Sequence, residues 1–354
     1  MSDKTIATAP PAPSSSSSSL YSLRIVIAGG EGHLGRLLAR RFSAAGHSVT
    51  TLTRSMRRSA IRKPWKTLHW DGREPGLWTE SLEGADAVIN LAGRSVDCRY
   101  NTKNRTEILR SRVESTIALG NAIQALCHPP HLWLNASTAT IYRHAFDREM
   151  DETTGELGGN EPDAPASWRF SIDVARQWEH SFFASHTPRT RKIALRAAMV
   201  MSPEIGEIFS IMSRLVRMGL GGAWGAGRQY MSWIHEADFF RAVEFLFEHE
   251  EISGVVNVAA PDPLPNAQFM SDLRAAWGIP FGLPSQPWML RVAAFFLRTE
   301  TELLLKSRRV VPAILQNHGF QFNFPEWPAA AQDLVRRWRE QSSFGTGHHS
   351  YSTE

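Results

Sequence analysis

The stretch Leu23–Gly35, LRIVIAGGEGHLG, decides the fold of this chain. It opens with a short β-branched apolar run, LRIVIA, and continues into the glycine-rich turn GGEGHLG. The residues that follow place apolar side chains at the i, i+3, i+4 spacing of one helix face, namely Leu34, Leu37, Leu38, Phe42 and Ala45. Strand, glycine turn and helix in this order predict the first βα unit of a doubly wound sheet.

The same alternation continues along the chain. Further strands are expected at HSVTTLT, DAVINLAG, HLWLNAST and RKIALRAAMV, with helical segments RTEILRSRVESTIALGNAIQAL and SIDVARQWEHSFFASH between them. This pattern predicts an α/β protein with a Rossmann-type doubly wound parallel sheet and a smaller, mainly helical C-terminal lobe. The expected divisions are a tail at 1–21, a dinucleotide-binding domain at 22–250 with substrate-lobe elements from about 200, a C-terminal lobe at 251–340 and a tail at 341–354.

Composition excludes several classes of protein. A net charge of +4 over 354 residues is too small to predict binding to nucleic acid. The two cysteines, Cys98 and Cys127, have no metal-ligand or disulfide spacing, so no metal site is expected and a reducing compartment is favoured. The most apolar stretch begins at Trp288, is about half the ~20 residues that a bilayer requires and contains Arg291, so no membrane span is expected.

With these classes excluded, we expect a cytoplasmic protein that acts on a small molecule. A homodimer is the assembly that we expect. The Pro- and Ser-rich N-terminus reads as a tail. A transit peptide, which would direct the chain to an organelle, is the alternative, and the lack of any arginine before Arg24 argues against it.

The glycines of the first turn indicate what the sheet binds. Missing side chains permit a tight turn, let backbone amides approach a pyrophosphate, and let the helix pack on the strand. The positive end of the helix then faces the phosphates. The alternative is a turn that only packs. The cofactor-binding residues expected here are Gly29, Gly30, Gly32, His33, Leu34 and Gly35.

The charge after the second strand predicts which dinucleotide binds. An NAD site usually has an acidic residue roughly 20 residues beyond the glycines, to hold the ribose 2′-hydroxyl. Here no acidic residue occurs from Gly32 to Trp70, and Arg54 directly follows the strand. A guanidinium suits a 2′-phosphate, so the expected cofactor is NADP(H). Further basic residues follow, of which Arg62 and Lys63 are interpreted as solvated: Arg57, Arg58, Arg62 and Lys63.

With these motifs the chain resembles an extended short-chain dehydrogenase/reductase, the superfamily of nucleotide-sugar epimerases and dehydratases. GGEGHLG, NLAG and STATIY carry that likeness. More narrowly, SRVEST, GLGGAWGAGRQYMSWIHEADF and NVAAPDPLPNAQF resemble the atypical branch labelled epimerase family proteins, which have a small C-terminal domain of unknown function. The resemblance covers about residues 23 to 338. It implies a Rossmann-type sheet, NADP(H) binding and a substrate cleft under the C-terminal lobe.

The resemblance also implies roles for single residues. Gly29, Gly32 and Gly35 would contact the pyrophosphate, and Arg54 the 2′-phosphate. Asp71 would contact the adenine amine, and Thr138 would hydrogen-bond the substrate oxygen. Asn90, Ala92 and Gly93 would form the loop beside the cofactor ribose. The residues expected on the substrate side are Arg196, Arg228, Gln229, Trp233 and His235. Alternatives stay open, because Trp233 suits a core, His235 a backbone hydrogen bond and Arg196 a structural ion pair.

One element of the superfamily's site is missing. Its members pair a tyrosine with a lysine four residues later on the helix after STATIY, so that the tyrosine exchanges a proton with the substrate. At the matching places stand Arg169 and Asp173, and none of the five tyrosines has a lysine four residues on. Two hypotheses follow. In the first, an oxidoreductase or epimerase-like enzyme uses Tyr142 or His235 for proton transfer, with Thr138 orienting the substrate. In the second, the protein binds NADP(H) without hydride chemistry, as a sensor or partner-binding module, and an Arg169–Asp173 ion pair would suit that role.

Overall fold

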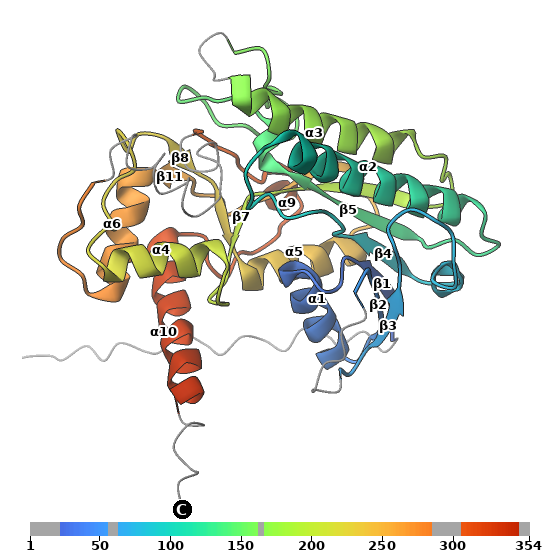
Figure 1. The fold of residues 1–354 in the computed structure, drawn as a ribbon. Helices are drawn as coiled ribbons and strands as arrows, with labels where there is room; N and C mark the ends of the chain where they lie inside the picture. The colour runs from blue at the N-terminus through green and yellow to red at the C-terminus, as the bar shows by residue number, and fades with distance from the viewer. Residues whose placement is uncertain (1–21, 56–62, 162–165, 285–305, 347–354) are drawn as a thin grey trace, which may run out of the picture.

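The computed structural model describes residues 22–55, 63–161, 166–284 and 306–346. Its centre is a seven-stranded parallel sheet in the order β10-β6-β5-β4-β1-β2-β3 (Figure 1). The sequence predicts the parallel sheet but not the order of its strands. The strands are β1 (Arg24–Ala28), β2 (Ser48–Thr53), β3 (Lys66–His69), β4 (Ala87–Asn90), β5 (Leu132–Thr138), β6 (Arg191–Ala197) and β10 (Gly254–Val258).

Helices cover both faces of the sheet. One face carries α1 (His33–Ala44) and α5 (Glu236–Glu248), and the other carries α2 (Thr102–Gln124) and α3 (Ala166–Ala184) (Figure 1). Successive strand residues point to opposite faces, so Ile25 and Ile27 pack toward α1 while Val26 packs toward α2. This double burial explains why β1 and β4 are nearly continuous apolar runs. Short 3₁₀ helices η1 (Thr79–Leu82) and η2 (Ala139–Ile141) join the elements.

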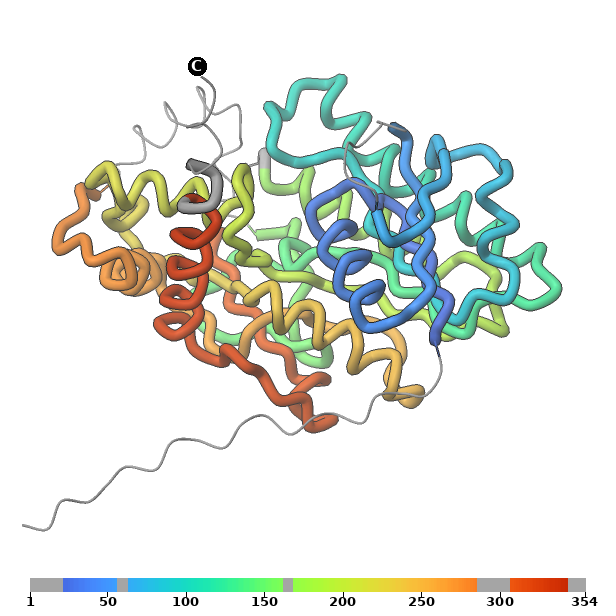
Figure 2. The backbone as a smooth tube through the Cα atoms, turned by 90° about the horizontal axis from the view of Figure 1, so that it is seen from below, coloured from blue at the N-terminus to red at the C-terminus, as the bar shows by residue number. Residues whose placement is uncertain are grey.

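A second apolar cluster forms the smaller lobe. It joins α4 (Ile208–Arg217), α6 (Asn266–Trp277) and α10 (Trp327–Thr346), and α6 packs against both other helices (Figure 2). The ring of Trp327 stacks on Phe269 with centroids 3.9 Å apart. The lobe and its junction with the sheet are completed by β7 (Met199–Met201), β8 (Tyr230–Met231), β9 (Trp233–His235), β11 (Leu264–Pro265) and α9 (Ala313–Asn317).

The structure changes one expected boundary. β10 lies beyond residue 250 and was expected in the C-terminal lobe, but it pairs in parallel with β6 at the edge of the main sheet. The short strand β3 was not expected from the sequence. The tail expected at 1–21, residues 347–354, Arg57, Arg58, Arg62 and the apolar stretch from Trp288 lie outside the described residues. The C-terminal tail was expected from 341, but α10 continues to Thr346. Among the helices that are described, none combines the length and apolarity that crossing a bilayer requires.

Candidate functional site

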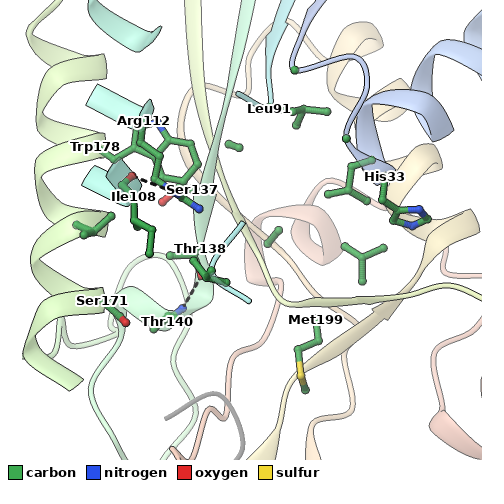
Figure 3. Close-up of a pocket in the computed structure, with 18 of the residues that line it drawn as sticks. His33, Leu91, Ile108, Arg112, Ser137, Thr138, Thr140, Ser171, Trp178 and Met199 are labelled. Carbon is green, nitrogen blue, oxygen red and sulfur yellow. Dashed lines mark hydrogen bonds between the residues drawn. The ribbon is translucent and has the colours of Figure 1, made fainter. Parts of the chain in front are cut away.

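A cavity of about 460 Å³ opens at the carboxyl ends of β1, β4, β5 and β6. In an open α/β sheet this edge, where the strand order reverses, is where ligands bind. Figure 3 shows His33 of the glycine turn on one side of the cavity and Arg112 with Trp178 on the opposite side. Thr138, at the end of β5, lies between these walls. The cavity therefore joins the expected cofactor turn to the expected catalytic strand end.

The glycine turn between β1 and α1 requires its glycines. Gly29 has a φ of +81°, which an L side chain rarely adopts. A Cβ atom on Gly35 would lie 2.4 Å from the Gly29 carbonyl oxygen, so this glycine lets α1 approach the turn. A Cβ on Gly30 would lie 2.3 Å from Thr51. These three positions are explained by the fold itself.

Gly32 is different, because the fold opposes a side chain there through one close contact only. Its φ is −67°, and a Cβ there would meet only the Gly29 carbonyl oxygen, at 3.3 Å. Gly32 lines the cavity and is the N-cap of α1, where no side chain caps the first amides. The amides of His33, Leu34 and Gly35 begin the helix, and all three residues line the cavity. An uncapped helix N-terminus beside a bare glycine fits a dinucleotide pyrophosphate.

His33 links the turn to the smaller lobe's entry segment. Its Nδ1 lies 3.0 Å from Glu204 Oε2, and its Nε2 is buried with no hydrogen-bond partner among the described residues. Arg36 reaches the same Glu204 oxygen at 3.4 Å. The loop after β7 is thereby held against the start of α1, which closes this side of the cavity.

The residues expected at the adenine end, Arg54 and Asp71, do not line the cavity. Arg54 is exposed and directly follows β2, whose Leu52 carbonyl accepts the amides of Gly29 and Gly30 at 3.0 and 3.2 Å. Asp71 is exposed, and hydrogen bonds from the amides of Arg73 and Glu74 lower the pKa of its carboxyl group. Lys63, which was interpreted as solvated, forms an ion pair with Glu31 of the turn.

Asn90 supports the cofactor loop from behind. Its side chain is fully buried, donates to Asn135 Oδ1 at 2.7 Å and accepts the amide of Ala92 at 3.1 Å. Gly93 gives the Arg112 guanidinium room, since a Cβ there would lie 3.2 Å from the guanidinium carbon. Leu91, rather than Asn90, Ala92 or Gly93, lines the cavity.

Thr138 lies where the sequence predicts, on the cavity at the end of β5. Its Oγ1 accepts the amide of Thr140 at 3.2 Å, which leaves the hydroxyl proton available to a ligand. The neighbouring Ser137 also lines the cavity, but its hydroxyl donates to Glu179 Oε1 at 2.5 Å. Thr138 is thus the hydroxyl at this strand end that can orient a substrate oxygen.

The expectation that Tyr142 faces the substrate does not fit the structure. The side chain is 1% exposed and is absent from the cavity lining. Its hydroxyl accepts from Arg196 Nη1 and donates to Asn257 Oδ1, both at 2.9 Å, and burial raises the pKa of the phenol. Arg196 in turn forms a two-point ion pair with Glu179. Arg196 therefore takes the structural role that the sequence left open.

The other residues expected on the substrate side also lie away from this cavity. His235 is 1% exposed, and its Nδ1 accepts the amide of Ala237 at 3.1 Å to cap α5, which confirms the backbone alternative. Burial lowers the pKa of its imidazole. Trp233 is fully buried in the core of the smaller lobe. Gln229 is buried and donates to the Trp224 carbonyl, while Arg228 is exposed.

On α3 the expected register needs correction. Arg169 and Asp173 are exposed, and neither lines the cavity. No ion pair joins them in the described structure, although the sensor hypothesis anticipated one. The α3 residues on the cavity are Phe170, Ser171, Val174 and Trp178, of which Phe170 and Val174 are four apart. The helix thus presents no tyrosine or lysine to the site.

Several cavity residues were missed by reasoning from the sequence. Tyr100 and Arg112 line the cavity with Ile108, Phe170, Ser171, Trp178 and Met199. Among Tyr100, Tyr142 and Tyr230, the tyrosines that the structure describes, Tyr100 alone reaches this lining. Arg112 stands in SRVEST, a motif that the sequence analysis used only for family resemblance. The sequence does not show which face of α2 turns inward, so it carried no signal for Arg112.

Comparison with known families gives two matches along the chain. Residues 25–259 match the model of the NAD dependent epimerase/dehydratase family, and residues 287–334 match a domain of unknown function, DUF1731. Epimerase family protein SDR39U1 of Mus musculus is 32% identical over 88% of this chain and 100% of its own length. Epimerase family protein ML0860 of Mycobacterium leprae is 31% identical, covering 84% of this chain and 91% of the relative.

Solved structures give the same result. A crystal structure of human epimerase family protein SDR39U1 (isoform 2) with NADPH is similar with a TM-score of 0.76 and 28% identity, over 89% of this chain and 99% of that one. A UDP-N-acetylglucosamine 4-epimerase from Bacillus cereus has a TM-score of 0.66 at 18% identity, over 90% and 97% of the two chains. The second likeness concerns the fold alone.

Proposed function

The chain belongs to the NAD dependent epimerase/dehydratase family, and from that premise we propose that it binds NADP(H) in the 460 Å³ cavity and uses it for oxidoreductase or epimerase-like chemistry on a small molecule. The observation that carries the proposal is Gly32. Its missing side chain avoids only one close contact within the fold, and it leaves room for a pyrophosphate against the uncapped start of α1.

Arg54 supports NADP(H) over NAD(H). It follows β2 beside the glycine turn, at the position where an NAD site would have a carboxylate. An exposed guanidinium without an acidic neighbour in sequence suits a 2′-phosphate dianion. The human relative was crystallised with NADPH, which agrees with this choice.

The residues of the cavity suggest how a substrate would be handled. The bound cofactor would supply or accept a hydride. Thr138 would donate its hydroxyl proton to a substrate oxygen, while one of the two lone pairs of its oxygen accepts the Thr140 amide. Tyr100 is the phenol positioned on the cavity and would exchange the proton that accompanies the hydride. Tyr142 and His235 have no catalytic role in this proposal, because both are buried and held in structural hydrogen bonds.

The test is NADPH oxidation by the purified full chain with a panel of ketones and aldehydes. Thr138→Val and Tyr100→Phe should each lower turnover by about 10²-fold or more, since a positioned proton donor contributes 10²–10⁴-fold. Neither change should weaken NADPH affinity. Tyr230→Phe is the matched control, because Tyr230 lies outside the cavity lining. Full activity in both cavity variants would refute these roles.

A catalytically silent NADP(H) sensor is the second candidate. The observation that favours it is α3, whose cavity face presents Phe170, Ser171, Val174 and Trp178 in place of a tyrosine and lysine. This candidate predicts that the protein binds NADPH tightly and that no added carbonyl compound leads to oxidation of the bound NADPH. Mass spectrometry of small molecules released from natively purified protein would identify the cofactor and any bound substrate.

A further inference from the structure

Arg112 brings a positive charge into the cavity, and we propose that it binds a carboxylate or phosphate of the substrate, which is then an organic anion with an apolar body. This inference rests on the proposed function, because it concerns the second occupant of the same cavity. It adds the chemical class of that occupant.

The position of Arg112 is fixed by contacts on three sides. The residue lies on α2, and its Nη1 donates to the carbonyl oxygens of Arg94 and Ile108, each at 3.0 Å. The guanidinium carbon lies 5.1 Å from the ring centroid of Trp178, which is a cation–π distance. Gly93 has no side chain, and a Cβ there would press on the guanidinium. The group is therefore held in place before any ligand arrives.

The charge of Arg112 is not neutralised within the described structure. Its guanidinium forms no ion pair with an Asp or Glu of the described residues within 4.0 Å. Glu207, the one acidic residue in the cavity lining, lies 3.9 Å from His33, on the opposite wall. Burial lowers the pKa of Arg112 to about 10, against the opposing attraction of Tyr100 and Cys98. An anionic ligand would offset the cost of burying this cation.

The remaining hydrogen-bonding capacity of Arg112 suits a planar or tetrahedral oxyanion. Nε and Nη2 have no hydrogen bond to any residue that the structure describes, whereas Nη1 has two. These two donors lie on one edge of the guanidinium, which pairs with two oxygens of a carboxylate or phosphate. A lysine at this position would lack that fork.

The rest of the lining indicates what the anionic group is attached to. Most of the lining side chains are apolar or aromatic, among them Val96, Ile108, Phe170, Val174 and Trp178. Of the hydroxyls, that of Ser137 is already committed to Glu179. A ligand with many hydroxyl groups would leave several of them unpaired here, so an apolar body is favoured.

An anion in this cavity has two possible sources, the substrate or the cofactor's own phosphates. The glycine turn expected to hold the pyrophosphate lies on the side of His33, and Arg112 lies on the other side, next to Trp178 (Figure 3). This separation assigns Arg112 to the substrate. If the anion belongs to the substrate, loss of Arg112 weakens binding of the substrate. If it belongs to the cofactor, loss of Arg112 weakens binding of NADPH.

Calorimetry on the full chain tests the assignment with 2-naphthoate and its uncharged analogue 2-naphthamide as probes, with and without saturating NADPH. Wild-type protein should bind 2-naphthoate at least about tenfold more tightly than 2-naphthamide. Arg112→Met should abolish that preference, and Arg112→Lys should retain part of it. Arg110→Met is the matched control, since Arg110 lies on the same helix, is exposed and pairs with Glu114. It should behave as wild type.

Equal binding of the two probes by wild-type protein would overturn the inference, as would a preference that survives Arg112→Met. A loss of NADPH affinity of about tenfold in Arg112→Met would assign the cation to the cofactor phosphates and would also overturn it. If wild-type protein binds no NADPH, the proposed function fails, but the probe preference without NADPH still decides the role of Arg112. Should Arg112→Met not fold, the wild-type comparison and Arg112→Lys decide it.

Discussion

Arg196 and Glu179 form a two-point ion pair in the protein interior, with Nε–Oε1 and Nη2–Oε2 distances of 2.8 and 2.7 Å. The pair joins β6 to α3 behind the cavity wall, and Ser137 and Tyr142 hydrogen-bond to it. This arrangement explains why the polar residues around the end of β5 divide into two groups. The Thr138 hydroxyl is open to the cavity. The Ser137 hydroxyl, which also borders the cavity, and the buried Tyr142 phenol bond to the pair that holds the sheet to the helix.

Breaking this pair should be costly. Glu179→Ala would leave a buried guanidinium without its counter-charge, and we expect it to lower the free energy of unfolding by about 3–5 kcal/mol. Urea unfolding followed by circular dichroism measures the loss. Glu340→Ala, which removes an exposed ion pair with Arg336, should cause no measurable change. An equal midpoint for wild type and Glu179→Ala would show that the pair does not carry the stability assigned to it.

Gly32→Val should abolish NADPH binding while the protein stays folded. The φ of −67° suits any residue, and the new Cβ meets only one carbonyl oxygen, at 3.3 Å. The rest of the side chain would fill the space beside the helix start. Calorimetry reports binding, and thermal unfolding reports the fold.

Gly76→Val is a suitable control for that substitution, because Gly76 lies outside the cavity lining and its Cβ would meet Trp78 only at 3.4 Å. It should bind NADPH as wild type does. Unchanged NADPH affinity in Gly32→Val would mean that the pyrophosphate does not lie at this turn.

Restoring a tyrosine and a lysine to α3 should depend on the helix face. Phe170→Tyr with Val174→Lys places both groups on the cavity and should raise NADPH-dependent carbonyl reduction by at least tenfold, within the 10²–10⁴-fold that a positioned proton donor supplies. Arg169→Tyr with Asp173→Lys, on the exposed face, should change nothing. Equal effects of the two double variants on turnover would contradict the register read from the structure.

Stability should depend on pH through Glu244 on α5. Burial and the neighbouring Glu248 raise the pKa of its carboxyl group to about 7, against the opposing charges of Arg241 and Arg41. The native state then holds a proton that the unfolded chain releases near pH 4.5, so stability falls as pH rises from about 4.5 to about 7 and stays lower above that range.

Glu244→Gln removes this dependence. We expect the free energy of unfolding of the variant to exceed that of wild type by about 1–2 kcal/mol at pH 8 and to equal it at pH 4. The difference at pH 8 is smaller than the full pKa shift would give, because the side chain is only partly buried. Urea unfolding at the two pH values measures the difference. An equal difference in unfolding free energy between variant and wild type at pH 4 and at pH 8 would show that Glu244 is not the titrating group.

Much of the fold could be predicted because strand, glycine turn and helix are local signals. The β1 run, the turn at Gly29 and the apolar stripe of α1 together define the parallel βα unit. The place of β10 in the sheet could not be predicted, since pairing with β6 depends on contacts between segments far apart in sequence. The four-residue strand β3 is too short and too exposed to give a periodic signal.

The site was predictable where it depends on the backbone and unpredictable where it depends on side-chain direction. Gly32 and Thr138 lie at a turn and at a strand end, and such positions follow from the element order. Tyr142 is only four residues past Thr138, but η2 turns the chain and directs its phenol toward Arg196. Arg112 reaches the cavity from the middle of α2, and which face of that helix turns inward depends on its packing against α3.

Titration of the full-length protein with NADPH and with NADH, followed by cofactor fluorescence, tests the central claim most directly. We expect one saturable site that binds NADPH at least tenfold more tightly than NADH, because a charge-assisted phosphate contact readily supplies about 1.4 kcal/mol. Arg54→Ala should remove the preference, whereas Arg40→Ala, which alters an exposed cation paired with Glu204, should leave it. Equal affinities for the two cofactors, or a preference unchanged in Arg54→Ala, would contradict the account.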